Sequence, residues 1–507
     1  MTNTAPFAAF RNFWSGNVLF RLGFGALVVF LMLFFAAASV ILPWWFVLIV
    51  VTFPLAFIAA ISMPIVGIVV MLVLVCGLVP DALSPSIKLG AGQIKAHELF
   101  ILFMLLLAMG RQSAIDELKP YVKWLMPVFC MLGLVLVAVA VAFFLFNTAP
   151  RDILSDARNY LGWLILFCLV GKIRTRKQLS RLQIGLVIVG LLVAAAALLQ
   201  FFTGHTFVQN ARVEELTSVS QSMGVVRSIV GAGNYFLIFA LFLLLARMMT
   251  GTTSTVAALP LVGFLAAGLV VNFGRGLWLS TFGGAMLLAF WLIGWRGVWR
   301  LAAAGVFGLA VALGALALYK PHIVEAAYER LVSTTSETLD RDTTLGWRLE
   351  EVTDATEKIV QSPFVGIGLG TSYKPVIRMN GRTTTVSDEV LTRYIHNAYV
   401  GLWLKFGILG LVTVAILIWH MIRRGLVMEK QTEDPKMRAL ALSIVAGFIV
   451  PTVTSFTQPE WLDQTGVAFF AVMLALQIIL HRQMTYGDPE RRSFGIPKMP
   501  KQASIRL

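Results

Sequence analysis

Long apolar blocks separated by short polar segments dominate the pattern of this chain. A helix needs about 20 apolar residues to cross a bilayer, and many of the blocks approach or exceed that length. No stretch alternates apolar and polar residues with period two, which argues against a β-barrel. The pattern predicts about fourteen spans, with ends uncertain by about 2–4 residues: 22–42, 43–61, 63–80, 97–110, 125–146, 160–171, 182–202, 230–247, 256–273, 276–294, 300–319, 398–420, 437–458 and 463–480.

One long polar segment, 320–396, interrupts this series between two of the expected spans. Apolar residues recur in its middle at helical spacing, which predicts a helix that Pro363 ends. The predicted stripe is Leu345, Leu349, Val352, Thr356 and Ile359. A glycine-rich run, 366–370, follows as a turn, and a second, smaller polar segment covers 204–227.

Composition supports a membrane protein. Apolar residues make up 58% of the 507 positions and charged residues only 13%, whereas soluble chains carry about 25% charged residues. The three cysteines lie inside apolar blocks, away from histidines and from each other. We therefore expect them to pack as apolar side chains, without a disulfide framework, a zinc site or thiol chemistry.

The net charge of +15 does not indicate nucleic-acid binding, because the basic residues are scattered between the spans. With a cytoplasmic N-terminus, 24 basic residues fall on the cytoplasmic side and 8 in short outer segments. The positive-inside rule therefore predicts cytoplasmic termini and a periplasmic 320–396 loop. Arg11 and Arg21 precede an apolar stretch longer than a signal-peptide core, so we expect no cleaved signal.

Four regions follow from this arrangement. We expect an N-terminal transmembrane bundle over 1–255, and a core over 256–420 that includes the 320–396 loop. C-terminal transmembrane helices should cover 421–481, before a basic cytoplasmic tail at 482–507.

Three outer-side residues are candidates for chemistry. Arg275 joins two spans almost without a loop, so it either anchors at the headgroups or holds a phosphate with its forked donors. Arg348 follows Trp347 beside the predicted loop helix, where an ordinary surface ion pair is the alternative. His396 lies where the loop returns to the membrane, and it is either an interfacial histidine or a base near neutral pH.

Two cations and one base on the same face suit transfer of a glycosyl group from a diphosphate carrier. The arginines would neutralise the leaving diphosphate, and His396 would take the proton of the attacking hydroxyl. Asn397 is expected to bind a sugar or to cap the following helix. Arg212 and Arg227 are further candidates for attracting the anionic substrate.

At this point the chain resembles the superfamily of O-antigen ligases and O-antigen polymerases, which are membrane glycan transferases. The resemblance covers roughly 256–419. It rests on Gly-Arg-Gly at 274–276, Trp-Arg-Leu-Glu-Glu at 347–351, Ser-Pro-Phe-Val-Gly-Ile-Gly-Leu-Gly at 362–370, and His-Asn-Ala-Tyr at 396–399 before Leu-Lys-Phe-Gly-Ile-Leu-Gly. The family commonly has serine where this chain has Gly274.

The span pattern and the resemblance together imply an all-α, GT-C-like polytopic fold of about 12–14 transmembrane helices with one large, partly helical periplasmic loop. It implies a metal-independent, inverting glycosyltransferase without cofactor, in the bacterial inner membrane, that uses an undecaprenyl-diphosphate-linked glycan. Arg275 and Arg348 would hold the diphosphate and His396 would be the base. The acceptor would be a growing glycan, in a polymerase, or lipid A-core, in a ligase.

Extra N-terminal spans and the basic 204–227 segment slightly favour a polymerase. A chain-length regulator and a flippase would then be partners, alongside membrane lipid. A transporter or flippase is the rival class, but it would place charges at mid-membrane, where Glu98 is the main ambiguous residue. A purely structural subunit would leave the long outer loop unexplained.

Overall fold

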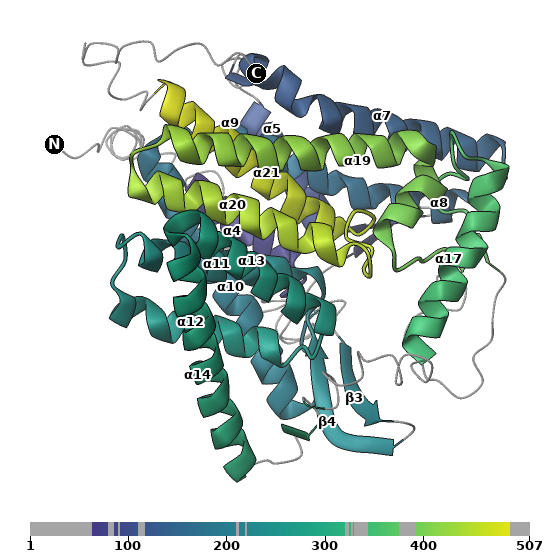
Figure 1. Ribbon diagram of the computed structural model, residues 1–507. Coiled ribbons are helices and arrows are strands. Elements are labelled where there is room, and N and C mark those ends of the chain that lie inside the picture. The colour runs from purple at the N-terminus through teal and green to yellow at the C-terminus, as the bar shows by residue number, and fades with distance from the viewer. Residues whose placement is uncertain are drawn as a thin grey trace, which may run out of the picture. The chain divides into compact units, whose positions relative to one another are not determined.

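The computed structural model describes residues 63–79, 86–89, 92–109, 117–208, 212–218, 221–319, 324–325, 328, 343–374 and 392–486. The chain divides into two compact units, Met1–Ser62 and Met63–Leu507, and every described residue belongs to the second. This unit is an all-α bundle with two small β-hairpins (Figure 1).

The helices agree closely with the predicted spans. Every span expected from residue 63 onward coincides with helical structure, and the spans 22–42 and 43–61 lie outside the described residues. The helices are α4 (Pro64–Val75), α5 (Ala96–Met109), α7 (Val122–Phe144), α8 (Pro150–Ala157), α9 (Leu164–Lys172), α10 (Arg176–Thr203), α11 (Asn234–Met249), α12 (Thr255–Val270), α13 (Arg275–Ile293), α14 (Trp295–Tyr319), α17 (Thr343–Gln361), α19 (Ala398–Gln431), α20 (Pro435–Thr454) and α21 (Gln464–Tyr486).

Within the described ranges, seven helical segments are long and apolar enough to cross a membrane. They are Lys119–Phe144, Pro150–Lys172, Arg176–Thr203, Arg275–Ile293, Ala398–Gln431, Pro435–Thr454 and Gln464–Tyr486, and α4, α5, α11 and α12 are shorter apolar helices. The most apolar windows of α20 and α21 are 78% and 83% buried in protein, against 28% for α13. The first two therefore form the centre of the bundle, beside α19 in Figure 1, while much of α13 faces outward.

A glycine-rich run, 366–370, anchors the long loop in the bundle. A break in α19 at Gly407, where φ is 69°, leaves carbonyl groups of the preceding turn open to new donors. The Ile367 N–H donates to the Leu404 carbonyl oxygen at 2.8 Å. Gly368 has φ of 82°, and a Cβ there would lie 2.5 Å from a backbone oxygen of α7, so the close approach requires glycine.

The loop helix was predicted correctly, and its buried face only in part. α17 ends at Gln361, two residues before Pro363. Ile359 of the predicted stripe is buried, but Leu349 is 61% exposed, and Glu351 and Ala355 complete the buried face. This rotation follows from tertiary contacts: a polar anchor at Glu351 and apolar packing of Ala355 and Ile359 outweigh the local apolar pattern.

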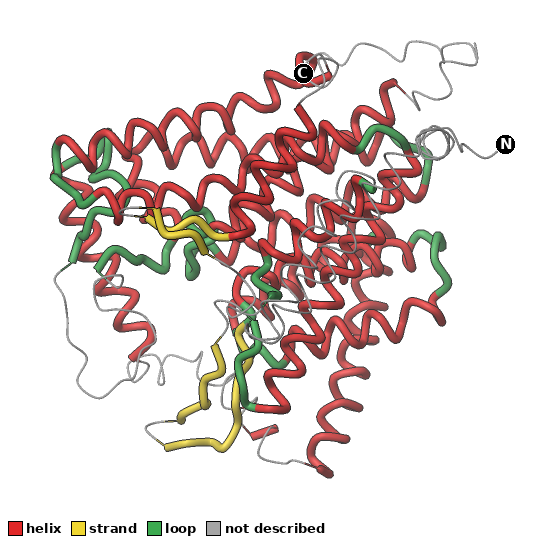
Figure 2. Tube along the Cα trace, turned by 180° about the vertical axis from the view of Figure 1, so that it is seen from behind, coloured by secondary structure: helices red, strands yellow, loops and turns green. Residues whose placement is uncertain are grey.

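The two hairpins were not predicted. β1 (Ser86–Leu89) pairs antiparallel with β2 (Gly92–Lys95), and β3 (Arg212–Ser218) pairs with β4 (Gln221–Ile229). Both appear in yellow in Figure 2. The second hairpin occupies most of the polar segment 204–227. The Ser228 N–H fixes β4 to the end of α12 by donating to the Val271 carbonyl oxygen at 3.1 Å.

Candidate functional site

One cavity of about 690 Å³ lies among helix ends on one side of the bundle. Arg275, Arg348 and His396, the three principal sequence candidates, all line it, and Arg227 joins them from β4. These residues are far apart in the chain, so their meeting is a result of the fold.

Helix N-termini surround this cavity. Asn234, Arg275 and Gln464, the first residues of α11, α13 and α21, line it, and His97 lies in the first turn of α5. A helix N-terminus presents unpaired N–H groups and a partial positive charge, which stabilise anions. At α21 these donors are already used, because Asp463 Oδ2 accepts the Thr465 and Gly466 N–H groups. The starts of α11 and α13 have no side-chain cap among the described residues, so there the backbone favours a negatively charged ligand.

Side-chain charges reinforce this preference. Five basic residues line the cavity against two carboxyl residues. The basic residues are Lys95, Arg158, Arg227, Arg275 and Arg348; the acidic residues are Glu460 and Asp463. Arginine offers paired N–H donors that match phosphate oxygens. The cavity is thus suited to a diphosphate. Its two carboxyl residues form an acidic wall, which a diphosphate does not need.

The turn before α13 places Arg275. Phe273 has φ of 51°, a left-handed conformation that costs a non-glycine residue about 1–2 kcal/mol. Its buried ring is held by Phe201, stacked with centroids 6.3 Å apart, and by Trp278 at 5.8 Å. The Trp278 indole N–H donates to the Leu269 carbonyl oxygen at 3.1 Å. Aromatic packing therefore secures the strained turn that directs α13 toward the cavity.

A buried carboxylate orients His396. The Nδ1 atom of His396 lies 2.8 Å from Oε2 of Glu351, and the His396 backbone N–H donates to the same oxygen at 3.1 Å. The Lys374 ammonium donates to the other oxygen, Oε1, at 3.0 Å. Burial raises the pKa of Glu351, but its hydrogen bonds to His396 and the nearby charges outweigh this, so the net pKa is lowered. Glu351 is therefore ionised at neutral pH.

This ionisation assigns the histidine tautomer. An ionised carboxylate only accepts hydrogen bonds, so in the neutral imidazole of His396 the proton is on Nδ1 and Nε2 keeps a lone pair. The His396 side chain is 35% exposed, against 6% for Glu351. The ring is thus held from one side and accessible on the other, which is the arrangement expected of a general base.

α17 supplies two of the site residues. Arg348 and Glu351 lie three positions apart, within one helical turn. The helix packs through Ala355 and Ile359 on a buried apolar cluster that includes Leu404 of α19. The packing of α17 therefore fixes the arginine and the orientation of His396 together.

The remaining sequence candidates fall in different places. The Asn397 side-chain oxygen accepts the backbone N–H groups of Tyr399 and Val400 at 3.0 and 3.1 Å. It thus caps α19, one of the two roles predicted for it. Arg212 begins β3, in register with Ile229 of β4, and its substrate-binding role stays a prediction.

Several cavity residues escaped the sequence analysis. Glu351 entered the sequence analysis only as part of the 347–351 motif, although its position one helical turn from Arg348 could have marked it. Glu460 and Asp463 occupy the short connection between α20 and α21, where ionisable groups at span ends are a recognisable signal. In the described part of the chain, no group of three or more His, Cys, Asp or Glu side chains could hold a metal ion.

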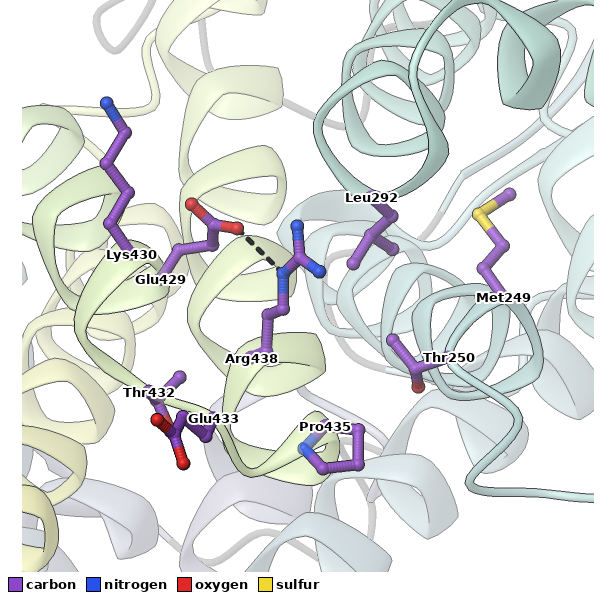
Figure 3. A pocket seen from close by; sticks show the side chains of 9 residues that line it. All are labelled: Met249, Thr250, Leu292, Glu429, Lys430, Thr432, Glu433, Pro435 and Arg438. Atoms are coloured by element: carbon purple, nitrogen blue, oxygen red, sulfur yellow. Dashed lines mark hydrogen bonds and ion pairs between the residues drawn. The ribbon is translucent and has the colours of Figure 1, made fainter.

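A second pocket, of about 430 Å³, lies at the opposite ends of the same helices (Figure 3). Met249, Leu292 and Glu429 line it, near the C-terminal ends of α11, α13 and α19. Arg438 Nε donates to Glu429 Oε1 at 2.7 Å. These two charges are paired with each other, so this pocket offers less for chemistry than the first. The two pockets thus lie at opposite ends of α11 and α13, as expected for helices that cross a membrane.

The fold and the cavity together define a multi-pass membrane protein with a polar, mainly basic site at its helix ends. Residues 260–415 match the O-antigen ligase family, so this part of the chain is an O-antigen ligase domain. Members of this family are membrane glycosyltransferases of the O-antigen ligase and polymerase type, acting on lipid-linked glycans. The resemblance predicted from the sequence is confirmed over this segment. Among curated proteins, none matches the chain.

Proposed function

We propose that this protein transfers an undecaprenyl-diphosphate-linked glycan to an acceptor hydroxyl at the periplasmic face, as a polymerase of glycan repeat units. The observation that carries the proposal is the single cavity lined by Arg275, Arg348 and His396. Those residues fit the three needs of the reaction: charge for the leaving diphosphate, positioning of the donor and a base for the acceptor.

In the proposed step, the acceptor oxygen forms a bond to the anomeric carbon of the donor as the bond from that carbon to the diphosphate oxygen breaks. The diphosphate leaves with the electron pair, and Arg275, Arg348 and the surrounding helix N-termini stabilise its charge. His396 Nε2 takes the hydroxyl proton. Attack opposite the leaving group inverts the anomeric configuration.

The preference for a polymerase rests on the extra spans expected at the N-terminus and on a second basic outer element. That element is the β3–β4 hairpin, and its Arg227 lines the cavity. A ligase that joins the glycan to lipid A-core uses the same chemistry and is the second candidate, favoured by the match of 260–415 to the O-antigen ligase family.

The test is transfer by purified protein in proteoliposomes, with undecaprenyl-diphosphate-linked repeat units and EDTA present. Formation of longer lipid-linked chains supports the polymerase, whereas glycan attached to added lipid A-core supports the ligase. Movement of the donor across the bilayer without a new glycosidic bond would support the transporter instead. Activity that requires an added divalent cation would overturn the metal-independent mechanism.

A first prediction concerns topology. Glu350 is exposed on α17 near the cavity, and Glu433 is exposed at the opposite helix ends. In a chain whose three native cysteines are replaced by alanine, a membrane-impermeant maleimide added to spheroplasts should label Glu350→Cys but not Glu433→Cys. Lysis should make both accessible. The opposite result would place the cavity in the cytoplasm and remove the periplasmic reaction.

A second prediction concerns Glu351 as the residue that positions His396. Glu351→Gln keeps the side-chain size but removes the charge that fixes the Nδ1–H tautomer. We expect kcat to fall roughly 10- to 100-fold, less than the ~10⁴-fold effect of the fully buried carboxylate in a serine-protease triad, because His396 is partly solvated. The donor KM should change little.

The control is Glu350→Gln, which alters the neighbouring exposed carboxylate on the same helix. Its kinetic constants should match the wild type. Loss of donor affinity rather than kcat in Glu351→Gln would instead indicate that Glu351 only holds α17 and Arg348 in place.

A further inference from the structure

The acidic wall of the cavity is formed by Asn234, Tyr235, Asn272, Glu460 and Asp463. These residues come from the start of α11, from the turn before α13 and from the α20–α21 connection. An anion-binding cavity does not need carboxyl groups, because they oppose a phosphate. Asp463 is explained by the fold, because its Oδ2 accepts the Thr465 and Gly466 backbone N–H groups at the start of α21. That leaves Glu460, whose place beside five basic residues calls for a second kind of ligand chemistry.

Glu460 is fixed in this wall by hydrogen bonds. Its side chain is buried, and the Tyr235 hydroxyl donates to Oε1 at 2.6 Å. The Tyr235 hydroxyl also lies 2.7 Å from the Thr454 hydroxyl of α20. Burial raises the pKa of Glu460 to about 8, so the carboxyl group is mostly protonated at neutral pH. A protonated carboxyl group both donates and accepts hydrogen bonds.

Two buried amides supply the second, independent observation. Among the residues that the structure describes, Oδ1 of Asn234 and Nδ2 of Asn272 find no hydrogen-bond partner, and both residues are more than nine-tenths buried while lining the cavity. Interchanging the amide atoms alters which atom is presented, but both amides still face the same cavity. A buried polar atom without a partner costs about 1–3 kcal/mol. Such atoms are explained when a ligand provides the missing bonds.

We propose that Asn234, Asn272 and Glu460 form the acceptor subsite, where they bind hydroxyl groups of the incoming sugar. This rests on the proposed function, since it names the second substrate of the same reaction. A sugar hydroxyl is both donor and acceptor, matching two amides and a protonated carboxyl group. Asn272 lies three residues before Arg275 in the same turn, so the subsite adjoins the diphosphate-binding arginine.

The test measures transfer with the acceptor varied at saturating donor. Asn234→Ala and Asn272→Ala should each raise the acceptor KM about 3- to 10-fold, the effect of losing one neutral hydrogen bond. The donor KM should stay within about twofold of the wild-type value. Glu460→Leu, which cannot hydrogen-bond, should raise the acceptor KM about tenfold, whereas Glu460→Gln, which keeps both a donor and an acceptor, should raise it less.

Two acceptors distinguish the sources of the sugar: the undecaprenyl-diphosphate-linked repeat unit and lipid A-core, both isolated from the bacterium that encodes the chain. In the asparagine variants and in Glu460→Leu, the acceptor KM should rise for whichever acceptor the wild type uses. Gln477→Ala removes a buried amide of α21 that bonds the Met421 carbonyl oxygen and does not line the cavity. It controls for general loss of packing and should leave the acceptor KM unchanged.

The outcomes separate this proposal from the proposed function. No transfer by the wild type to either acceptor would overturn both. Normal wild-type transfer with an unchanged acceptor KM in the two asparagine variants and Glu460→Leu would overturn the subsite alone. Should a variant fail to fold, Tyr235→Phe provides a milder change, because it removes only the hydroxyl that donates to Glu460. Its acceptor KM should rise, and an unchanged value would count against the subsite.

Discussion

Replacing His396 by alanine is expected to lower kcat by about 10²–10⁴-fold while leaving donor affinity close to the wild-type value. The physical reason is that a sugar hydroxyl is a weak nucleophile at neutral pH and needs a base held at the right place. The loss corresponds to roughly 3–5 kcal/mol of transition-state stabilisation. His396→Gln should be similarly impaired, because an amide cannot take a proton. Reconstituted transfer beside donor binding measures both quantities.

Two other histidines sharpen this experiment. His205 is exposed and does not line the cavity, so His205→Ala should behave as wild type. His97 does line it, but its Nε2 donates to Gln464 Oε1 at 3.0 Å, which leaves that nitrogen unable to act as a base. If His97→Ala abolished turnover while a folded His396→Ala protein retained it, the base would have to be reassigned.

The helices were predictable because long apolar blocks are a strong local signal. The blocks around α10, α13 and α21 appear as helices with ends close to those expected. The β3–β4 hairpin was not predictable in the same way. Its strands, Arg212–Ser218 and Gln221–Ile229, do not stand out as apolar blocks, and the hairpin is held by contacts outside it, such as the bond from Gln200 to the Ser228 hydroxyl. Local periodicity carries little information about such contacts.

The residues of the candidate site were likewise only partly predictable from the sequence. Arg275 stands out in the sequence because a charge between two spans with almost no loop is costly unless it reaches the interface or a polar cavity. His396 stands out because the long loop returns to the membrane there, and Arg348 because it lies beside the predicted loop helix. Glu351 was missed because the apolar stripe placed the wrong face of α17 inward, and only the contact with His396 reveals its orientation. Glu460 likewise becomes notable only when Tyr235, more than 200 positions earlier, is seen beside it.

The second large effect is expected at the two arginines. Arg275→Ala and Arg348→Ala should each lower kcat/KM by about 10²–10³-fold, the usual result of removing one group that stabilises developing charge. Part of the loss should appear as weaker donor binding, because both arginines are proposed to contact the diphosphate before reaction as well. Arg275→Lys should recover only part of the activity, since lysine cannot fork onto two oxygens.

A control arginine distinguishes charge at the cavity from charge on the protein as a whole. Arg300 is exposed on α14 and does not line the cavity, so Arg300→Ala should transfer glycan at the wild-type rate. The double variant Arg275→Ala/Arg348→Ala should lose less than the product of the single losses, because both arginines act on one diphosphate. Strictly multiplicative losses would indicate that the arginines serve different ligands. Normal rates in both single variants would show that the arginines are only interfacial anchors.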